Sequence, residues 1–253
     1  MDSRIPALRS MKDRGEKITV LTAYDYPLAR LLDESGVDVV LVGDSLGMVV
    51  LGFPDTTSVT MEHMLHHTAA VARGVKQALV VADLPFASYD TPERALQNSH
   101  RLIEAGAQAV KLEGGVSRRT VIGALSEAGI PVMAHIGMLP QSVRVEGGYK
   151  TKGKTAEEVV ALLEDARAVE AAGAFAVVLE LVLSEVSGRI TGAISIPTIG
   201  IGAGAGCDGQ VLVTHDLVGL FPWFTPKFVL PESDIASTIR AAASAFVKRT
   251  KAL

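Results

Sequence analysis

The sequence predicts a single α/β domain over residues 1–253, folded as a (β/α)8 barrel, also called a TIM barrel. Three observations predict this fold. Eight short apolar runs alternate with helical patterns, a glycine joint recurs between them, and polar residues follow the runs. Eight strand–helix units in about 250 residues are typical of this barrel.

The apolar runs have the character of buried parallel strands. They are short, rich in β-branched residues, and do not alternate with polar residues. Such runs suit parallel strands that are covered on both faces. They lie at 18–21, 37–42, 79–82, 109–112, 131–134, 175–179, 196–199 and 211–213.

Helical patterns fill the spaces between these runs. We expect helices over 28–35, 93–105, 118–128 and 156–172, with a final helix over 233–253. Thr91 and Pro92 supply an N-cap and a first-turn proline for the second helix. Thr155 followed by Glu158 fits a capping box at the start of the fourth.

A short joint recurs where a helix ends and a strand begins. Glu34-Ser35-Gly36-Val37, Glu104-Ala105-Gly106-Ala107 and Glu127-Ala128-Gly129-Ile130 share it, and residues 170–173 are a looser copy. A glycine there can take the left-handed conformation that ends a helix. A doubly wound open sheet is the alternative fold. Its glycine-rich fingerprint belongs to the first βα unit, whereas the glycine run at 200–204 comes late in this chain.

Composition excludes several functional classes. Lys and Arg number 24 against 28 Asp and Glu, and a net charge of −4 argues against nucleic-acid binding through a basic field. One cysteine excludes a disulfide framework and a four-cysteine zinc site. The sequence contains no run of about 18 apolar residues, which is the length that would predict a membrane span. The first residues lack the apolar core of a secretory signal, so we expect a cytoplasmic protein.

Polar residues follow successive predicted strands. They are Asp25, Asp44, Ser45, Asp83, Lys111, Glu113, His135 and Glu180. Because the carboxyl ends of parallel barrel strands meet at one rim, where barrel active sites lie, we expect these side chains to converge. A polar residue after a strand is often only the start of a loop, but a series of them favours a functional rim.

Converging carboxylates repel one another and raise each other's pKa unless a cation lies between them. Asp44, Asp83 and Glu113 offer hard oxygen ligands, which favour Mg²⁺ over structural zinc. A 2-oxo acid could chelate that ion, which would act as a Lewis acid and stabilise an enolate. Lys111 could pair with the substrate carboxylate. Glu180, flanked by leucines, could be the base that removes a proton α to the carbonyl.

Three other features carry weaker signals. The glycines of 200–206 could cradle a phosphate or form a tight turn. The three lysines of loop 147–154 could belong to a lid that attracts an anionic cosubstrate or to an exposed loop. His63, His66 and His67 lie on a predicted helix without an H-E-x-x-H pattern, which favours a helix face over a zinc site.

Several stretches resemble the ketopantoate hydroxymethyltransferase family, in order and across nearly the whole chain. They are TAYDY at 22–26, VGDSLGM at 42–48, ADLPF at 82–86, KLEGG at 111–115, AHIG at 134–137, GGYK at 147–150, PTIGIGAG at 197–204 and CDGQ at 207–210. The resemblance implies a Mg²⁺-dependent barrel of the phosphoenolpyruvate/pyruvate type. It implies transfer of a hydroxymethyl group from 5,10-methylenetetrahydrofolate to 3-methyl-2-oxobutanoate. The product would be 2-dehydropantoate, on the route to pantothenate and coenzyme A.

The resemblance also implies roles for individual residues. Asp44, Asp83 and Glu113 match the metal ligands, and Glu180 matches the proton acceptor. The matching substrate contacts are Asp44, Ser45, Asp83, Lys111 and, as a pocket residue, His135. Small-molecule substrates and a homo-oligomer are expected, namely a decamer of two pentameric rings. The chain departs from the family at Leu183, where a proline is usual, and ends at Leu253 without the common Phe-Pro ending.

Two other functions are compatible with the same rim. One is another Mg²⁺-dependent enzyme acting on 2-oxo acids, such as an aldolase or lyase, which would turn over the oxo acid without a folate donor. The other is a barrel that binds metabolites without catalysis, for which binding without turnover would be the sign.

Overall fold

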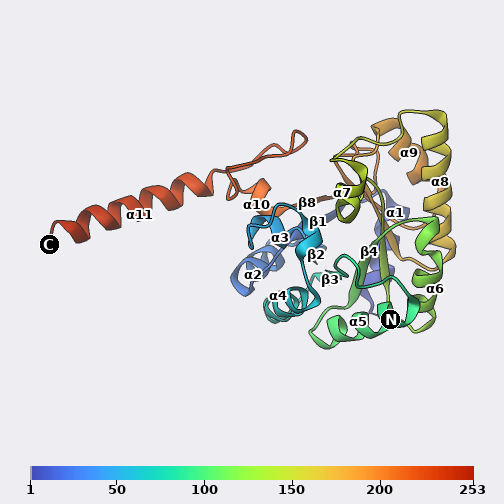
Figure 1. Cartoon of the computed structure of the whole chain (residues 1–253), viewed down its shortest axis with the longest axis horizontal. Helices are drawn as coiled ribbons and strands as arrows, with labels where there is room; N and C mark the ends of the chain where they lie inside the picture. Colours follow the sequence, from blue (N-terminus) through green and yellow to red (C-terminus); the bar gives the residue numbers. More distant parts are fainter. Residues whose placement is uncertain (1) are drawn as a thin grey trace. The chain divides into compact units, whose positions relative to one another are not determined.

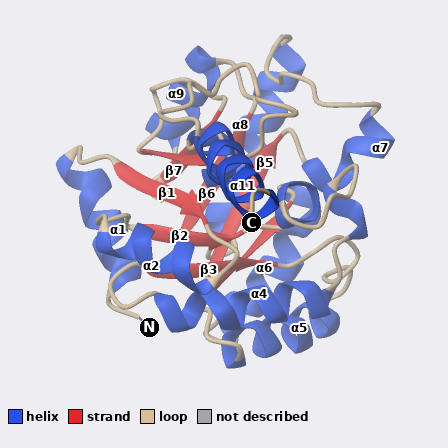
Figure 2. Cartoon of the chain, turned by 90° about the vertical axis from the view of Figure 1, so that its left-hand side faces the viewer, coloured by secondary structure: helices blue, strands red, loops and turns tan. Residues whose placement is uncertain are grey.

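The computed structural model describes residues 2–253, and it confirms the barrel. Eight parallel strands close on themselves in chain order, from β1 to β8. Figure 1 labels several of these strands along the chain. Helices lie around the outside of the strands (Figure 2). The strands are β1 Ile18–Thr22, β2 Val39–Val42, β3 Leu79–Asp83, β4 Ala109–Glu113, β5 Val132–Gly137, β6 Ala176–Glu180, β7 Thr198–Ile201 and β8 Gly209–Leu212.

The helices include all five that the sequence predicts, with small shifts at their ends. The α-helices are α1 Arg4–Arg14, α2 Tyr26–Glu34, α3 Leu46–Val49, α4 Met61–Gly74, α5 Pro92–Glu104, α6 Arg119–Glu127, α7 Val143–Glu146, α8 Ala156–Ala171, α9 Ser184–Ala193, α10 Thr214–Leu217 and α11 Ile235–Lys251. Short 3-10 turns lie at η1 Thr56–Ser58, η2 Val116–Arg118 and η3 Pro140–Ser142. Within residues 2–253, no helix combines the length and apolar character needed to cross a bilayer.

The chain divides into two compact units. One ends at Val211 and carries the barrel, and the other is Leu212–Leu253. In the second unit, the N–H of Ile235 donates to the carbonyl of Val218, and the Asp234 side chain caps α11. A single domain over 1–253 therefore stays a prediction.

The recurring glycine joint adopts the predicted conformation in all four copies. The φ angles of Gly36, Gly106, Gly129 and Gly173 are 81°, 110°, 77° and 92°. These values lie in the left-handed region, which a side chain disfavours. At Gly106 a Cβ atom would also lie 2.5 Å from Cβ of Ala72. Each joint therefore ends a helix and turns the chain into the next strand.

The predicted capping box at the start of α8 is only half formed. The Thr155 hydroxyl accepts from the N–H of Glu158, as expected. The carboxylate of Glu158 instead accepts from the N–H groups of Gly153 and Lys154. Those two N–H groups precede the N-cap, so the Glu158 carboxylate holds the loop that leads into α8.

Alternate residues of the strands enter two separate apolar clusters. One cluster takes Val20, Val39, Leu41, Leu79, Val81, Ala109, Met133, Ala176, Val178, Ile199 and Val211, together with Ile5 and Leu8 of α1. Side chains two residues apart share one face of a strand. Because these strands form a closed barrel, this cluster fills the barrel interior.

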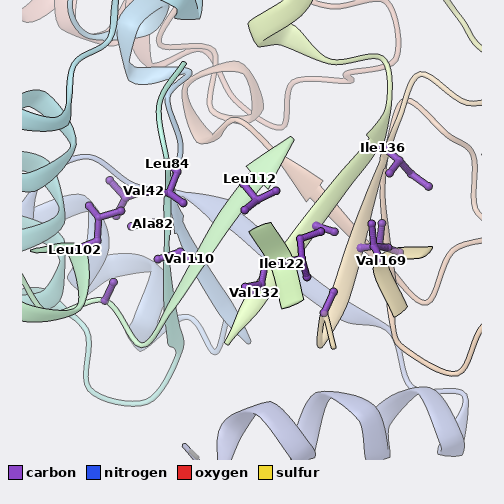
Figure 3. Close-up of a cluster of buried hydrophobic side chains, with 14 of the residues drawn as sticks. Val42, Ala82, Leu84, Leu102, Val110, Leu112, Ile122, Val132, Ile136 and Val169 are labelled. Atoms are coloured by element: carbon purple, nitrogen blue, oxygen red, sulfur yellow. The ribbon is translucent and has the colours of Figure 1, made fainter. Parts of the chain in front are cut away.

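The other cluster lies between the strands and the surrounding helices. Figure 3 shows part of it, with Val42, Ala82 and Val110 from the strands and Leu102 from α5. The strands have apolar residues on both faces, so one face packs in the barrel interior and the other packs against the helices. This double burial explains why the strand sequences do not alternate.

Asp33 ties the end of α2 to the segment before β3. It is 5% exposed, and its carboxylate accepts from the N–H groups of Lys76, Gln77 and Ala78 at 2.8–3.0 Å. Burial opposes its charge, but these N–H groups prevail and lower the pKa of Asp33.

We expect Asp33→Asn to lower the free energy of unfolding by about 1.5–3 kcal/mol, because an amide cannot accept all three hydrogen bonds. Urea denaturation at about pH 7 would measure this loss. The folded-state pKa is lowered, so the contribution of Asp33 is present above the unfolded pKa and disappears in acid. Asp13→Asn, at an exposed aspartate, should change stability by less than about 0.5 kcal/mol. An equal loss in both variants would contradict the assigned role.

Candidate active site

The candidate site lies at the carboxyl ends of the barrel strands, on their interior face. In β3 the interior residues Leu79 and Val81 are followed two positions later by Asp83. The same spacing adds polar residues to three more strands, namely Lys111 and Glu113 in β4, His135 in β5 and Glu180 in β6. The interior face is thus apolar in its lower part and charged at its carboxyl end.

Asp83 and Lys111 form a buried ion pair at the centre of this group. They are register partners in β3 and β4, and Lys111 Nζ lies 2.7 Å from Asp83 Oδ1. They are 2% and 5% exposed. Burial opposes the charge of Lys111, but Asp83, Asp44 and Glu113 prevail and raise its pKa. Lys111 therefore stays protonated and positively charged among these carboxylates.

Asp44 follows β2 and joins the same group. Its backbone N–H donates to Asp83 Oδ2 at 2.9 Å, so both Asp83 oxygens accept hydrogen bonds. Burial and the nearby Asp83 raise the pKa of Asp44 to about 7, with Lys111 opposing. An acid with this pKa carries only part of its charge at neutral pH.

Glu113 is linked to Asp44 through Gln141, a residue that the sequence analysis missed. Gln141 donates from Nε2 to Asp44 Oδ2 at 2.8 Å and from its backbone N–H to Glu113 Oε2 at 3.0 Å. Burial and Asp44 raise the pKa of Glu113 well above its usual range. Gln141 is neutral and lies in η3, so neither charge nor periodicity marked it. Its position six residues after His135 offered no signal of its own.

His135 lies between two carboxylates. Its Nε2 is 3.3 Å from Glu180 Oε2, and its Nδ1 is 3.7 Å from Glu113 Oε1. Neither ring nitrogen makes a hydrogen bond within the described part of the chain. Burial and Lys111 lower the pKa of His135 well below its usual range, so the ring is neutral.

Glu180 has the environment expected of a base. It ends β6, and burial raises its pKa to about 8, with Lys111 opposing and Asp83 adding to the rise. The next residue, Leu181, has a positive φ of 48°, which is uncommon for a residue with a side chain. A sharp turn thus follows directly after Glu180.

Two other predicted rim residues have different surroundings. Ser45 is half-buried, and its hydroxyl lies 2.8 Å from the Tyr24 hydroxyl. Asp25 is exposed and caps α2 by accepting from the N–H of Leu28. The expectation that Asp25 converges with the other acids is therefore wrong. The chain turns into α2 immediately after β1, and the cap holds its carboxylate there.

The lysine loop is attached to the chain that follows Glu180. The N–H of Lys152 donates to Leu181, and the carbonyl of Lys152 accepts from Leu183. Tyr149 is half-exposed, and burial together with Glu180, Asp44 and Glu113 raises its pKa. Tyr149 therefore lies within electrostatic reach of the site, while the lid function of this loop stays a prediction.

The glycines of 200–206 and the histidines of 63–67 make contacts typical of packing and helix capping. A Cβ atom at Gly204 would lie 2.2 Å from Ser184 Oγ, which favours close approach in a tight turn. His63 completes a capping box with Thr60, and His67 Nδ1 lies 2.6 Å from the Tyr24 carbonyl. Among residues 2–253, no three His, Cys, Asp or Glu side chains are already arranged around a metal position.

Comparison with known sequences gives one consistent result. The family model described as ketopantoate hydroxymethyltransferase matches residues 2–252. A 3-methyl-2-oxobutanoate hydroxymethyltransferase of Clostridium novyi (strain NT) is 53% identical over 253 residues, covering 99% of this chain and 92% of that protein. The enzyme of the same name from Dehalococcoides mccartyi (strain ATCC BAA-2266 / KCTC 15142 / 195) is 54% identical over 249 residues, covering 98% and 88%.

Solved structures of low sequence identity share the fold. Phosphonopyruvate hydrolase in complex with oxalate and Mg²⁺ superimposes with a TM-score of 0.65 at 15% identity, covering 99% of this chain and 88% of that one. 2,3-Dimethylmalate lyase, a member of the PEP mutase/isocitrate lyase superfamily, gives 0.63 at 20% identity with the same coverage. These similarities confirm the (β/α)8 barrel fold.

We expect Lys111→Met to lower the free energy of unfolding by about 3–5 kcal/mol, because it leaves Asp83 buried without its partner. Adding Asp83→Asn to this variant should restore part of the loss, since the uncompensated charge is removed. Urea denaturation of the single and double variants measures both effects. A Lys111→Met protein as stable as the wild type would show that the pair does not balance the buried charge.

Proposed function

Because the chain belongs to the ketopantoate hydroxymethyltransferase family, we propose that its barrel rim converts 3-methyl-2-oxobutanoate into an enolate that accepts a one-carbon unit. The hydroxymethyltransferase activity and its place in pantothenate biosynthesis rest on 53% identity along 99% of the chain. The donor would be 5,10-methylenetetrahydrofolate, and the product 2-dehydropantoate.

The donor set at the rim fits a magnesium ion. Asp44, Asp83 and Glu113 are buried carboxylates, and among residues 2–253 Lys111 is the cation that contacts this group. Burial is the largest cause of the raised pKa values of Asp44 and Glu113, and neighbouring carboxylates add to it, so a cation beside them would favour their ionised forms. Oxygen-only ligands match the preference of Mg²⁺. When bound, the ion would supply Lewis-acid polarisation of the keto group.

Glu180 is proposed as the base. Only its ionised form can take the proton from C3 of the oxo acid, and a pKa of about 8 makes that form a good acceptor near neutral pH. Glu180 ends β6, whereas Asp83 and Glu113 end β3 and β4, and Asp44 lies two residues after β2. This separation leaves the base free from metal ligation.

Lys111, Ser45 and His135 are proposed to hold the substrate. The Lys111 ammonium can pair with the substrate carboxylate, and the Ser45 hydroxyl can donate a hydrogen bond. The His135 ring is neutral and has two ring nitrogens without hydrogen-bond partners in the described chain, so it can donate to one polar group and accept from another. Burial of these groups keeps water from the enolate.

The observation that carries this proposal is the gathering of the buried Asp44, Asp83 and Glu113 and the largely buried Glu180 around Lys111. Placing four carboxyl groups in a barrel interior with one lysine is energetically costly, and such clusters are typical of functional sites. Cytoplasmic localisation and a decamer of two rings stay predictions. Exposed apolar side chains in the second unit, among them Trp223 and Phe246, support a contact between subunits.

We expect Glu180→Gln to slow exchange of the C3 proton of 3-methyl-2-oxobutanoate by roughly 10²–10⁴, the usual contribution of a general base. NMR in D₂O with Mg²⁺ and without folate follows this exchange, and a parallel sample with EDTA tests the need for the ion. Glu185→Gln, at an exposed acid of α9, should exchange at the wild-type rate. Exchange unaltered in Glu180→Gln would exclude it as the base.

The exchange rate should also depend on pH. Since the active form of Glu180 is the carboxylate and its pKa is about 8, the rate should fall as pH drops below about 8 and level off above it. The same NMR experiment, repeated from roughly pH 6 to 9, measures this profile. A rate that rises toward acid would mean that a protonated group limits exchange.

A further inference from the structure

We infer that Gln141 is a positioning residue that orients Asp44 and Glu113 for the metal ion. This inference rests on the proposed function, because it concerns the ligands of the proposed ion. Gln141 is itself 5% exposed and lies in η3, after β5. Through one side-chain contact and one backbone contact, it links Asp44, two residues after β2, to Glu113 at the end of β4.

Each of the two carboxylates gives one oxygen to Gln141. The side-chain Nε2 donates to Oδ2 of Asp44 at 2.8 Å, and the backbone N–H donates to Oε2 of Glu113 at 3.0 Å. The second oxygen of each carboxylate is not engaged by Gln141. Fixing one oxygen of each group sets the rotation of both carboxylates, which limits where their other oxygens can point.

The amide of Gln141 can take only one orientation at this place. Nε2 also donates to the carbonyl of Leu84 at 3.0 Å. The Leu84 carbonyl accepts hydrogen bonds only, and so does the Asp44 carboxylate in its ionised form, which is the form that would bind a metal ion. If the amide were turned over, its oxygen would face the Asp44 carboxylate and the Leu84 carbonyl. None of these three oxygen acceptors would then receive a hydrogen bond from the contact.

Tyr89 enforces the same orientation from the other side. Its hydroxyl accepts from the N–H of Glu113 at 3.3 Å and lies 2.5 Å from Gln141 Oε1. An alternative contact to the carbonyl of Glu113 is longer, at 3.5 Å. The hydroxyl proton therefore points to Oε1, and Nε2 must face Asp44. A continuous chain of donors thus runs from Glu113 through Tyr89 and Gln141 to Asp44.

A neutral donor suits this position better than a charged one. Lysine or arginine would neutralise the carboxylates and compete with a metal ion for them. Glutamate would bring a further acceptor against Asp44 and Leu84. Glutamine supplies N–H groups without altering the charge of the site, so Asp44 and Glu113 stay available to a cation. Partners that orient metal ligands in this way contribute about 10–100-fold to metal affinity.

The test is the affinity of the protein for Mn²⁺, used as a probe for Mg²⁺ and measured by titration calorimetry without oxo acid or folate. We expect Gln141→Met to raise the Kd for Mn²⁺ by about 10–100-fold. The Mg²⁺ concentration that gives half-maximal C3 exchange should rise by a similar factor. Both readings report on the ion, whereas a purely structural residue would affect thermal stability alone.

Gln108→Met is the matched control. Gln108 is a partly buried glutamine whose amide also both accepts and donates, since it accepts from the N–H of Val80 and donates to the carbonyl of Gly106. It precedes β4, at the opposite end of that strand from Glu113. This variant should lose stability and keep the wild-type Kd. Tyr89→Phe, which removes only the hydroxyl, should raise the Kd in the same direction and replaces Gln141→Met if that variant does not fold.

The outcomes separate this inference from the proposed function. If the wild type binds Mn²⁺ and neither Gln141→Met nor Tyr89→Phe changes the Kd, Gln141 does not position the ligands, although the proposed function stands. If Gln108→Met weakens binding as much as Gln141→Met, the effect is general destabilisation and the inference is wrong. If the wild type binds no Mn²⁺, the proposed metal site fails and the inference fails with it.

Discussion

The ion pair between Lys111 and Asp83 is the contact around which the rest of the site is arranged. It forms because the two residues are register partners on neighbouring strands, both facing the barrel interior. Removing two charges from water is costly, and only close pairing offsets that cost. Asp83 then accepts the Asp44 N–H with its second oxygen, so the loop after β2 is fixed by the same pair.

One lysine does not balance the acids that surround it. Asp44, Glu113 and Glu180 all have raised pKa values, and burial is the largest cause in each case. Such an arrangement stores unfavourable electrostatic energy, which proteins usually keep only where function requires it. The imbalance therefore supports a bound cation beside Asp44 and Glu113 and a separate base at Glu180.

The barrel supplies the rigidity that this arrangement needs. The lower part of the interior is filled by apolar side chains such as Leu79 and Met133, and Ile5 of α1 packs into the same cluster. The strands that carry the site are thus held on their inner face by this core and on their outer face by the helices. Side chains on such strands are placed more accurately than side chains on loops. Gln141 and Tyr89 extend that order to the loops above the strands.

The sequence by itself determined the strand–helix alternation, the four glycine joints and which polar residues stand at the ends of strands, because these features depend on neighbours along the chain. It could not show which face of each strand points inward, since both faces are apolar. Register and closure of the barrel decided that Asp83 meets Lys111 and that His135 lies between Glu113 and Glu180. They also left Asp25 outside as a helix cap and brought in Gln141. These outcomes depend on contacts between segments that are distant in the sequence. A neutral glutamine in a loop, such as Gln141, has no local sequence pattern that would reveal its contacts with Asp44 and Glu113.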